Sequence, residues 1–191
     1  MLSSHSWKLA RTLLESAGFS VAVLKVNACH VGVPQRRIRA FIVCTLGGSA
    51  AQARDMERRA QEMSTRAPTT VHDIFPSWNL YFMWGCFKDA HIHRTDRPCM
   101  TLRTCCAARA GKGYRPTPKC AGTLDDKPHF LTIPELCVVQ GLGRDYRFPN
   151  GMSRSRCGKQ IGNSVCPAVM RWVMVQVGQK PHESDGSRET P

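Results

Sequence analysis

The sequence predicts an α/β protein, and three observations lead to that class. Residues 4–17 repeat apolar side chains at helical spacing. Two runs rich in β-branched and aromatic residues, 19–26 and 38–45, follow and are typical of strands. Further helical patterns at 132–141 and 162–178 come after a long irregular middle, so helices and strands are mixed along the chain.

The first helix and the two strands form one predicted group. Ser4 or Ser6 is placed to cap the helix, and Gly18 is placed to end it. Residues 27–35 form a short connection, so the strands 19–26 and 38–45 are expected to pair as a hairpin. Because a two-stranded hairpin is marginally stable by itself, this piece is expected to require a partner sheet.

The middle of the chain predicts less regular structure. After Gly47 and Gly48, residues 50–64 are compatible with a helix and very polar, which predicts a solvated helix. The run WNLYFMW, Trp78 to Trp84, predicts a core strand, with stacking on nucleic-acid bases as the alternative. Residues 105–127 form a basic loop rich in glycine and proline, which suits phosphate contacts.

The last third of the chain predicts two helices. Thr132 and Glu135 have the spacing of a capping box, and the helix is expected to end near Gly141 or Gly143. Residues 148–156 are predicted to be a loop. Residues 162–164 are predicted to open a helix with Pro167 in its first turn, and residues 179–191 form a polar tail predicted to be disordered.

Composition limits the partners. The net charge is +13, with a pI near 9.7, which favours a polyanion: nucleic acid first and an anionic membrane surface second. No apolar run approaches the roughly 20 residues of a membrane span. Ten cysteines occur without a secretory signal, so reduced intracellular thiols are expected. His91, His93, Cys105 and Cys106 lack the usual spacing of zinc ligands, which favours ordinary thiols over a metal site.

Residues 32–43 read GVPQRRIRAFIV and carry the most specific signal. A turn at Gly32 and Pro34 leads through three arginines into the second strand. Arg37 and Arg39 are two residues apart, so on an extended backbone they are predicted to share a face. Paired guanidiniums suit a phosphate or a base edge, and the alternative is an edge strand with solvated arginines.

Four stretches together resemble the DNA cytosine-5 methyltransferases. GVPQRRIRAFIV is similar to the eighth conserved block of that family, RPCMTLRT (97–104) to the ninth and QIGNSVCP (160–167) to the tenth. LTIPE (131–135), with Gln140 and Gly141 after it, matches the stretch that normally precedes the tenth block. One such match is weak, but four in the family's order make a specific signal.

The family's catalytic half has no counterpart in the sequence. The glycine-rich cofactor loop FxGxG, the Pro-Cys-Gln nucleophile loop and the Glu-Asn-Val loop are all missing. The resemblance therefore implies the C-terminal half of such an enzyme: an edge hairpin and a C-terminal helix of a Rossmann-like methyltransferase sheet, plus a small, irregular target-recognition lobe. The implied division is 1–46 for catalytic-domain strands, 47–130 for target recognition, 131–178 for helices returning to the catalytic domain, and 179–191 for the tail.

The resemblance also implies a chemistry. In the family a cysteine thiolate adds to a flipped cytosine, which then takes a methyl group from S-adenosyl-L-methionine. The implied roles in this chain are catalytic support from Arg37 and Arg39, and a partial cofactor pocket at Asn163 and Ser164. The implied DNA contacts come from Gln35, Arg36, Arg103, Arg109, Lys112 and Arg115.

The implied partners are DNA and a complementing N-terminal methyltransferase chain that supplies the cysteine and glutamate, with no membrane involved. The implied location is the cytoplasm of a bacterial or phage-type system, at the nucleoid. Without that second chain we expect no activity. The alternative is a non-catalytic DNA-binding module, or the relic of a truncated methyltransferase.

Overall fold

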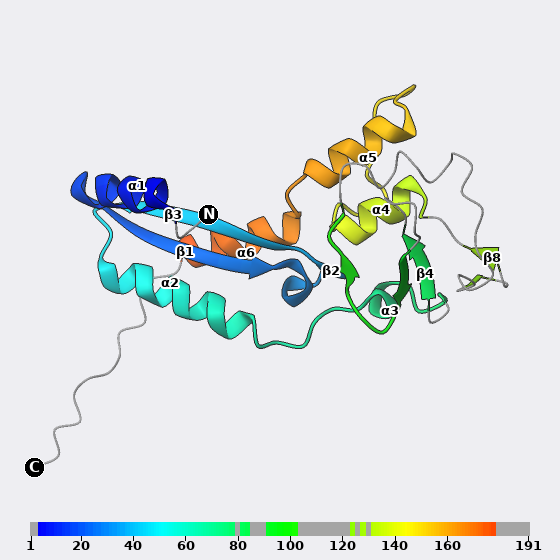
Figure 1. Ribbon diagram of the computed structural model, residues 1–191, viewed down its shortest axis with the longest axis horizontal. Coiled ribbons are helices and arrows are strands. Elements are labelled where there is room, and N and C mark those ends of the chain that lie inside the picture. Colours follow the sequence, from blue (N-terminus) through cyan, green and yellow to red (C-terminus); the bar gives the residue numbers. More distant parts are fainter. Residues whose placement is uncertain are drawn as a thin grey trace, which may run out of the picture. The chain divides into compact units, whose positions relative to one another are not determined.

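The computed structural model describes residues 4–78, 81–84, 91–102, 123–124, 127–128 and 131–178 (Figure 1). The chain divides into two compact units, which are described separately. Unit 1 comprises residues 1–26, 39–65 and 173–191, and unit 2 comprises residues 27–38 and 66–172. Residues 47–65, which the sequence assigned to target recognition, therefore group with the hairpin strands. Compactness does not assign function, so the functional division stays a prediction.

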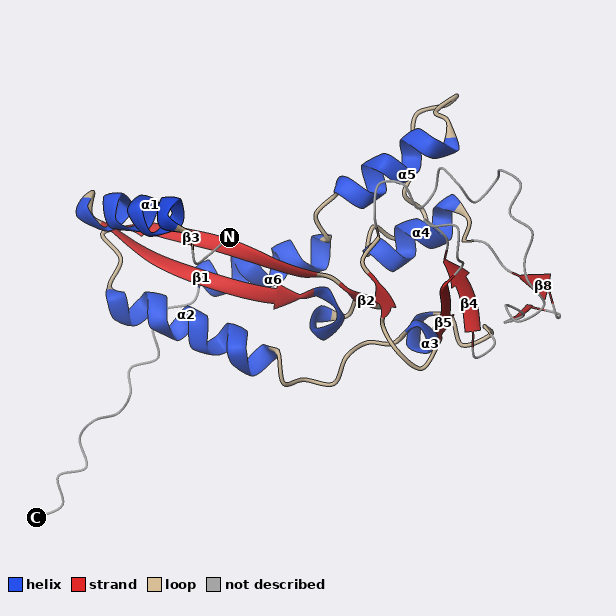
Figure 2. Ribbon diagram, viewed as in Figure 1, coloured by secondary structure: helices blue, strands red, loops and turns tan. Residues whose placement is uncertain are grey.

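Unit 1 is built on a two-stranded sheet of β1 (Phe19–Asn27) and β3 (Ile38–Leu46), with a few end residues falling in unit 2 (Figure 2). The Gly47 amide donates to the Gly18 carbonyl at 3.0 Å. Because Gly18 precedes β1 and Gly47 follows β3, this bond makes the pair antiparallel. The predicted hairpin is confirmed.

Helix α1 (His5–Ser16) begins and ends where its sequence predicts. The Ser4 hydroxyl accepts a hydrogen bond from the Trp7 amide at 3.2 Å, and Gly18 follows the helix with a φ of 85°. On the strand side, Arg11 Nη2 donates to the Val21 carbonyl at 3.4 Å, which attaches α1 to β1.

Helix α2 (Ala50–Met63) corrects the prediction of a solvated helix. Ala53, Met56, Ala60 and Met63 are all buried, and they recur at the spacing of one helix face. On β1, the Val23 amide donates to the Glu57 carboxylate at 2.9 Å. The helix is therefore amphipathic. Its apolar face is narrow and consists of alanine and methionine, so the many charged residues around it made the whole helix look solvated.

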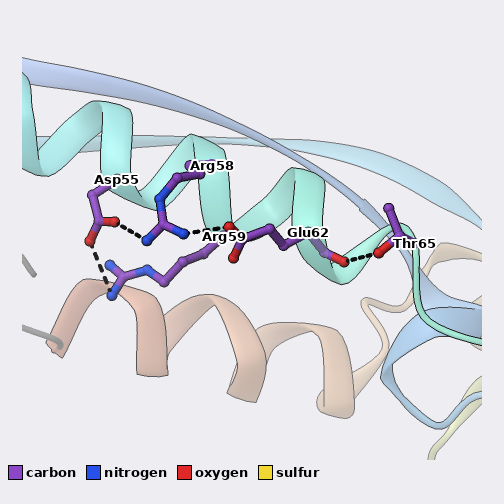
Figure 3. A network of polar contacts seen from close by, with 5 residues as sticks. All are labelled: Asp55, Arg58, Arg59, Glu62 and Thr65. Atoms are coloured by element: carbon purple, nitrogen blue, oxygen red, sulfur yellow. Dashed lines mark hydrogen bonds and ion pairs between the residues drawn. The ribbon is translucent and has the colours of Figure 1, made fainter.

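Ion pairs and hydrogen bonds connect the polar side chains of α2 along the helix (Figure 3). Arg58 pairs with Asp55 at 2.6 Å and also with Glu62, and Arg59 lies 3.4 Å from Asp55. The Thr65 hydroxyl donates to the Glu62 carbonyl at 2.7 Å just beyond the helix. Ion pairs three and four residues apart stabilise a helix modestly, so α2 contributes little uncompensated charge.

The described part of unit 2 has short elements up to residue 128 and longer helices after residue 132. A 3-10 turn, η1, spans Ala28–Val31. The remaining elements are β2 (Gln35–Arg36), α3 (Val71–Ile74), β4 (Tyr81–Trp84), β5 (His91–Arg94), β6 (Cys99–Met100), β7 (Thr123–Leu124), β8 (Lys127–Pro128), α4 (Ile133–Gln140), α5 (Arg154–Asn163) and α6 (Pro167–Gly178), whose second half belongs to unit 1.

The sheets of unit 2 are small. Strands β2 and β6 pair in parallel, with Gln35 opposite Cys99. Strands β4 and β5 pair antiparallel, as do β7 and β8. The expected strand at 78–84 is confirmed only from Tyr81 onward. Trp78 precedes it and stacks on Phe75, with ring centroids 4.0 Å apart.

The core of unit 2 lies around α4, which packs against α5. The predicted capping box opens α4: the Thr132 amide donates to the Glu135 carboxylate at 2.7 Å, and the Glu135 amide donates to the Thr132 hydroxyl at 3.4 Å. Gly141 ends the helix with a φ of 82°, a left-handed conformation that favours glycine. The core residues are Val71, Phe75, Trp78, Cys99, Leu102, Leu131, Leu136, Cys137, Val139 and Ile161.

Two predictions about the last third were wrong. The loop expected at 148–156 gives way to α5 at Arg154, because the Ser153 hydroxyl caps the Arg156 amide at 3.4 Å. Gly162 and Asn163 end α5 and do not open the next helix, which begins at Pro167. The predicted tail at 179–191 lies outside the described residues.

Candidate functional site

The turn before the arginines is held from both sides. Gly32 has a φ of 85°, and Val33 and Pro34 after it are buried. The Val33 amide donates to the Ala28 carbonyl at 3.2 Å, and the Pro34 carbonyl accepts from the Cys99 amide at 2.9 Å. The bond between Cys99 and Pro34 is part of the parallel β2–β6 pairing, and it fixes the direction in which the following residues leave the turn.

Gln35 is fully buried, and both polar atoms of its side-chain amide have partners within the protein. Its nitrogen donates to the Val139 carbonyl at 3.1 Å and to the Gln140 side-chain oxygen at 2.9 Å. Its oxygen accepts from the Leu102 amide at 3.0 Å. A buried amide must be paired, and here every pairing is internal. Gln35 thus joins β2 to the end of α4 and to the segment after β6.

Arg37 is also buried, with 7% of its surface exposed. One guanidinium nitrogen donates to the Leu102 carbonyl at 3.3 Å, and another donates to the carbonyls of Gly162 and Ser164, both at 3.1 Å. The last two carbonyls lie at the C-terminal end of α5, where backbone oxygens lack helical partners and carry partial negative charge. The guanidinium therefore caps α5 from a segment 125 residues away in sequence.

Gln140 completes this group, and the sequence analysis assigned it no role. Its nitrogen donates to the Ser164 carbonyl at 2.8 Å and to the Ser164 hydroxyl at 3.1 Å. The Ser164 hydroxyl donates in turn to the Ile161 carbonyl at 2.8 Å. We call Gln35, Arg37, Gln140 and Ser164 the Arg37 cluster. The available signal was the Gln-Gly pair noted at residues 140–141, which was used only to match a motif.

Three other predicted residues are exposed. Arg36, Arg39 and Asn163 all present their side chains to solvent. Arg37 lies between the end of β2 and the start of β3, so the strand is interrupted there and its two-residue alternation does not carry from Arg37 to Arg39. The shared face predicted for this pair is replaced by a division into one buried and one exposed arginine. The DNA and catalytic roles of these residues stay predictions.

The remaining predicted DNA contacts, Arg103, Arg109, Lys112 and Arg115, lie outside the described residues. The same holds for most of the basic loop at 105–127 and for Cys105 and Cys106. Within the described residues, no three histidine, cysteine or acidic side chains gather as a metal site would require.

Asn163 is, among the described residues at the end of α5, a side chain that a polar ligand can reach. Its side chain is exposed at the end of α5, while the Ser164 hydroxyl beside it is occupied by Gln140 and the Ile161 carbonyl. The helix start that was predicted at residues 162–164 would have supplied free backbone N–H groups here, but these residues lie at the C-terminal end of α5. What the site offers is one free amide, with a donor and an acceptor, on a turn fixed by the Arg37 cluster.

Two buried cysteines of unit 2, Cys29 and Cys137, are in environments that disfavour the reactive thiolate. Burial raises the pKa of the Cys137 thiol to about 11, with a further contribution from nearby Cys157, and burial also raises the pKa of Cys29. Because the thiolate is the reactive form, these groups are protonated at neutral pH.

A surface pocket of about 230 Å³ lies in unit 1 among α1, β1 and α2. Three of its charged groups have partners: Arg11 pairs with Glu15 at 2.8 Å, and the Glu57 carboxylate accepts from the Val23 amide. The Ser20 hydroxyl is buried beneath Gly48, where a Cβ would come within 2.4 Å of it. The pocket contains none of the predicted site residues.

Comparisons with known proteins point to one class. The model of the C-5 cytosine-specific DNA methylase family matches residues 3–85, which include the arginine strand. The chain is also similar to the type II methyltransferase M.HgiDI of Herpetosiphon aurantiacus, with 28% identity over 161 residues. That alignment covers 82% of this chain and 50% of the enzyme, so the chain spans about half the length of the curated relative it matches. The mixed α/β fold is compatible with a methyltransferase.

No helix among the described residues is both long and apolar enough to cross a bilayer.

Proposed function

We propose that this chain is the C-terminal segment of a DNA cytosine C5-methyltransferase, which binds intracellular DNA and completes the pocket for S-adenosyl-L-methionine. The catalytic cysteine and glutamate would come from a segment outside this sequence. Without them, the chain is expected to transfer no methyl group. The supporting similarities are the match at residues 3–85 and the 28% identity to a type II methyltransferase.

The Arg37 cluster is the observation that carries the proposal. Gln35 and Arg37 belong to the stretch that resembles the eighth family block, Leu102 to the ninth, and Gly162 and Ser164 to the tenth. Side chains of the first stretch bind the backbones of the other two, so three matching stretches far apart in sequence meet at one point. This convergence supports a shared function better than three separate motif matches do.

The proposed roles divide the two arginines. Arg39, which is exposed, contacts the flipped cytosine and the nearby phosphate. Arg37 and Gln35 support it by fixing the turn and the end of α5, since their own hydrogen-bonding groups are used internally. Gln35 is therefore expected to act on DNA binding indirectly.

The cofactor role falls to Asn163. S-adenosyl-L-methionine supplies the methyl group when it is bound. The exposed Asn163 amide fits such a polar ligand, because it can both donate and accept a hydrogen bond. Ser164 stays a proposed second contact, and its hydroxyl also holds the turn through its bonds to Gln140 and the Ile161 carbonyl.

DNA binding would rest on charge. The net charge of +13 suits a polyanion, and the exposed Arg36 can contribute a phosphate contact. Arg103, Arg109, Lys112 and Arg115 are proposed to add contacts from the recognition region. Such contacts position a protein on DNA without reading its sequence, so affinity is expected to fall steeply with salt.

Transfer of tritiated methyl groups to mixed-sequence DNA tests the proposal. The full chain is assayed alone and after mixing with the part of M.HgiDI that lies outside its aligned half. The expected result is transfer only in the mixture. Transfer by the chain alone would contradict the claim that the nucleophile is missing, and silence in both samples would contradict the methyltransferase role.

A second candidate function is a non-catalytic DNA-binding module, which includes a relic of a truncated enzyme. The absence of Pro-Cys-Gln and Glu-Asn-Val stretches from the sequence favours it. Salt-sensitive DNA binding combined with silence in both methyl-transfer samples would favour this alternative.

A further inference from the structure

Basic residues are concentrated in the segment that joins α4 to α5 and in the first part of α5. Residues 143–160 contain five arginine or lysine residues and one acidic residue, Asp145, so this short segment carries four charges of the net charge of +13. Four of the basic side chains are exposed. We call these four the basic surface of unit 2: Arg144, Arg147, Arg156 and Lys159.

Helix α5 has one buried side and one exposed side, and its basic residues lie on the exposed side. The buried residues of the helix are Cys157, Gly158, Ile161 and Gly162. The helix packs against α4 (Figure 1). Arg156 and Lys159 are three residues apart, so they are neighbours on the opposite side, which faces solvent. Their charges therefore point away from the core of unit 2.

The segment before α5 is attached to the same core. The Arg147 guanidinium donates to the Arg144 carbonyl at 3.4 Å, which holds these two residues together. The rings of Tyr146 and Phe148 meet edge to face, with centroids 5.1 Å apart. Phe148 packs against the hydrophobic core to which Ile161 of α5 contributes. Both basic pairs are thus carried by segments that one core supports.

The basic surface has no carboxylate partner among the described residues. None of its four members forms an ion pair there. On α2, by contrast, Arg58 and Arg59 both pair with Asp55. Arg156 lies in the first turn of α5, which has no acidic residue, and positive charge at that end of a helix is unfavourable. These charges therefore do not stabilise α5, and they suit an anion outside the chain.

We propose that the basic surface of unit 2 is a second contact surface for DNA, which binds the phosphate backbone of a duplex. The contacts that the family resemblance implies lie elsewhere, at Arg36 and Arg39 and in residues 103–115. This inference rests on the proposed function, which makes DNA the polyanion. Three of the four side chains are arginines, whose planar fork of donors suits phosphate oxygens. Such contacts position the chain on DNA without reading the sequence.

Salt-dependent DNA binding tests this surface. Fluorescence anisotropy gives the Kd of the full chain for a labelled, mixed-sequence duplex of about 30 base pairs, in NaCl from about 50 to 200 mM. Two double variants are compared with the unmodified chain: Arg156→Gln with Lys159→Gln, and Arg144→Gln with Arg147→Gln. Each lost phosphate contact should reduce the slope of log K against log salt by about 0.9, so each double variant should bind at least about tenfold more weakly at about 100 mM NaCl.

A matched control removes the same charge elsewhere. Lys8→Gln with Arg54→Gln replaces two exposed basic side chains of α1 and α2, in unit 1. Because a loss of charge without a lost phosphate contact changes counterion release little, this variant should keep its Kd within about threefold. Circular dichroism of the same samples checks folding. The two double variants change different segments, so misfolding of one leaves the other as the test.

Three results would overturn the inference. The first is binding of both double variants with the same Kd and salt slope as the control. The second is failure of the unmodified chain to bind the duplex. The third is binding to phosphatidylserine vesicles that the double variants lose while their DNA binding stays unchanged, which would assign the surface to an anionic membrane.

Methyl transfer separates this inference from the proposed function. The unmodified chain is assayed in the mixture with the unaligned part of M.HgiDI. If the mixture methylates DNA and the double variants bind DNA normally, the function stands and this surface fails. If the double variants lose DNA binding while the mixture transfers no methyl group, the surface stands and the methyltransferase role fails.

Discussion

The Arg37 cluster is a group of paired, largely buried polar side chains, whereas strand β3 exposes a row of mostly apolar ones, Ala40, Ile42, Cys44 and Leu46. In the cluster, buried polar groups meet partners from three distant parts of the same chain. On strand β3, apolar side chains remain in solvent, with Leu46 70% exposed. The contrast teaches that the polar groups of the Arg37 cluster find their partners within unit 2, whereas unit 1 leaves apolar side chains of β3 exposed. Substitutions should therefore change the free energy of unfolding strongly in the Arg37 cluster and weakly at the exposed residues of β3.

The largest effect is expected at Arg37. Replacing it with leucine leaves the carbonyls of Leu102 and Gly162 buried without this donor, so the free energy of unfolding should fall by about 3 kcal/mol. Urea unfolding followed by circular dichroism measures it. Arg36→Leu is the matched control, since that side chain is exposed, and should change stability by less than about 0.5 kcal/mol. Equal losses in the two variants would contradict the capping role.

Gln140 should show a smaller loss of the same kind. Gln140→Leu removes the donor to the Ser164 carbonyl and the acceptor of Gln35, at a cost of about 2 kcal/mol in the same unfolding assay. Gln160→Leu makes the same change at an exposed position of α5 and should be nearly neutral. A neutral Gln140→Leu would mean that the cluster contributes little.

The capping box of α4 gives an effect of intermediate size. Thr132→Ala removes the hydroxyl that accepts from the Glu135 amide, and the loss should be about 1 kcal/mol. Thr132→Ser keeps a hydroxyl and should retain most of the stability. If serine fails to retain more stability than alanine, the cap is not the cause of the loss.

Alkaline pH should weaken unit 2 slightly. Burial raises the pKa of Cys137 from 9.0 to about 11, so its contribution is fully present below pH 9 and is lost as pH rises toward 11. The Tm should fall by roughly a few degrees over that range. The fall should be shallower in Cys137→Ala, which lacks the titrating thiol. An identical pH dependence in both proteins would exclude Cys137 as its source.

The smallest change in the free energy of unfolding is expected at Ile42, an exposed residue of β3. Ile42→Ala in the isolated chain should change the free energy of unfolding by less than about 0.5 kcal/mol, because the side chain is half exposed. Leu24→Ala, on the buried strand of the same sheet, should cost about 3 kcal/mol. A large loss at Ile42 would show that its face is already covered within the chain.

Local patterns were predictable from the sequence. The hydroxyl caps at Ser4 and Thr132 act within three residues of themselves, so a short stretch contains all the necessary information. The hairpin strands were equally clear, because their composition is uniform along their length. The buried face of α2 was visible in its spacing, but the charges around it outweighed alanine and methionine in the interpretation.

Long-range pairing was not predictable. The family resemblance implied a DNA contact for Gln35, but no local pattern indicated that its side chain would pair with Gln140, which is 105 residues away. The end of α5 was misplaced for the same reason. Gly162 and Ser164 were assigned to a helix start, while in the structure their carbonyls bind Arg37, 125 and 127 residues away, at a helix end. Neither pairing can be predicted from local sequence propensities, because the partners are more than 100 residues apart.

The central claim is that the exposed Arg39 serves the methylation reaction, while its buried neighbour Arg37 holds the structure. Arg39→Ala, in the full chain mixed with the unaligned part of M.HgiDI, tests it most directly when methyl transfer and DNA affinity are measured on the same samples. The account predicts that transfer falls by at least about tenfold while the Kd for DNA changes by less than about threefold. Equal losses of transfer and affinity would contradict it and leave Arg39 as an ordinary phosphate contact.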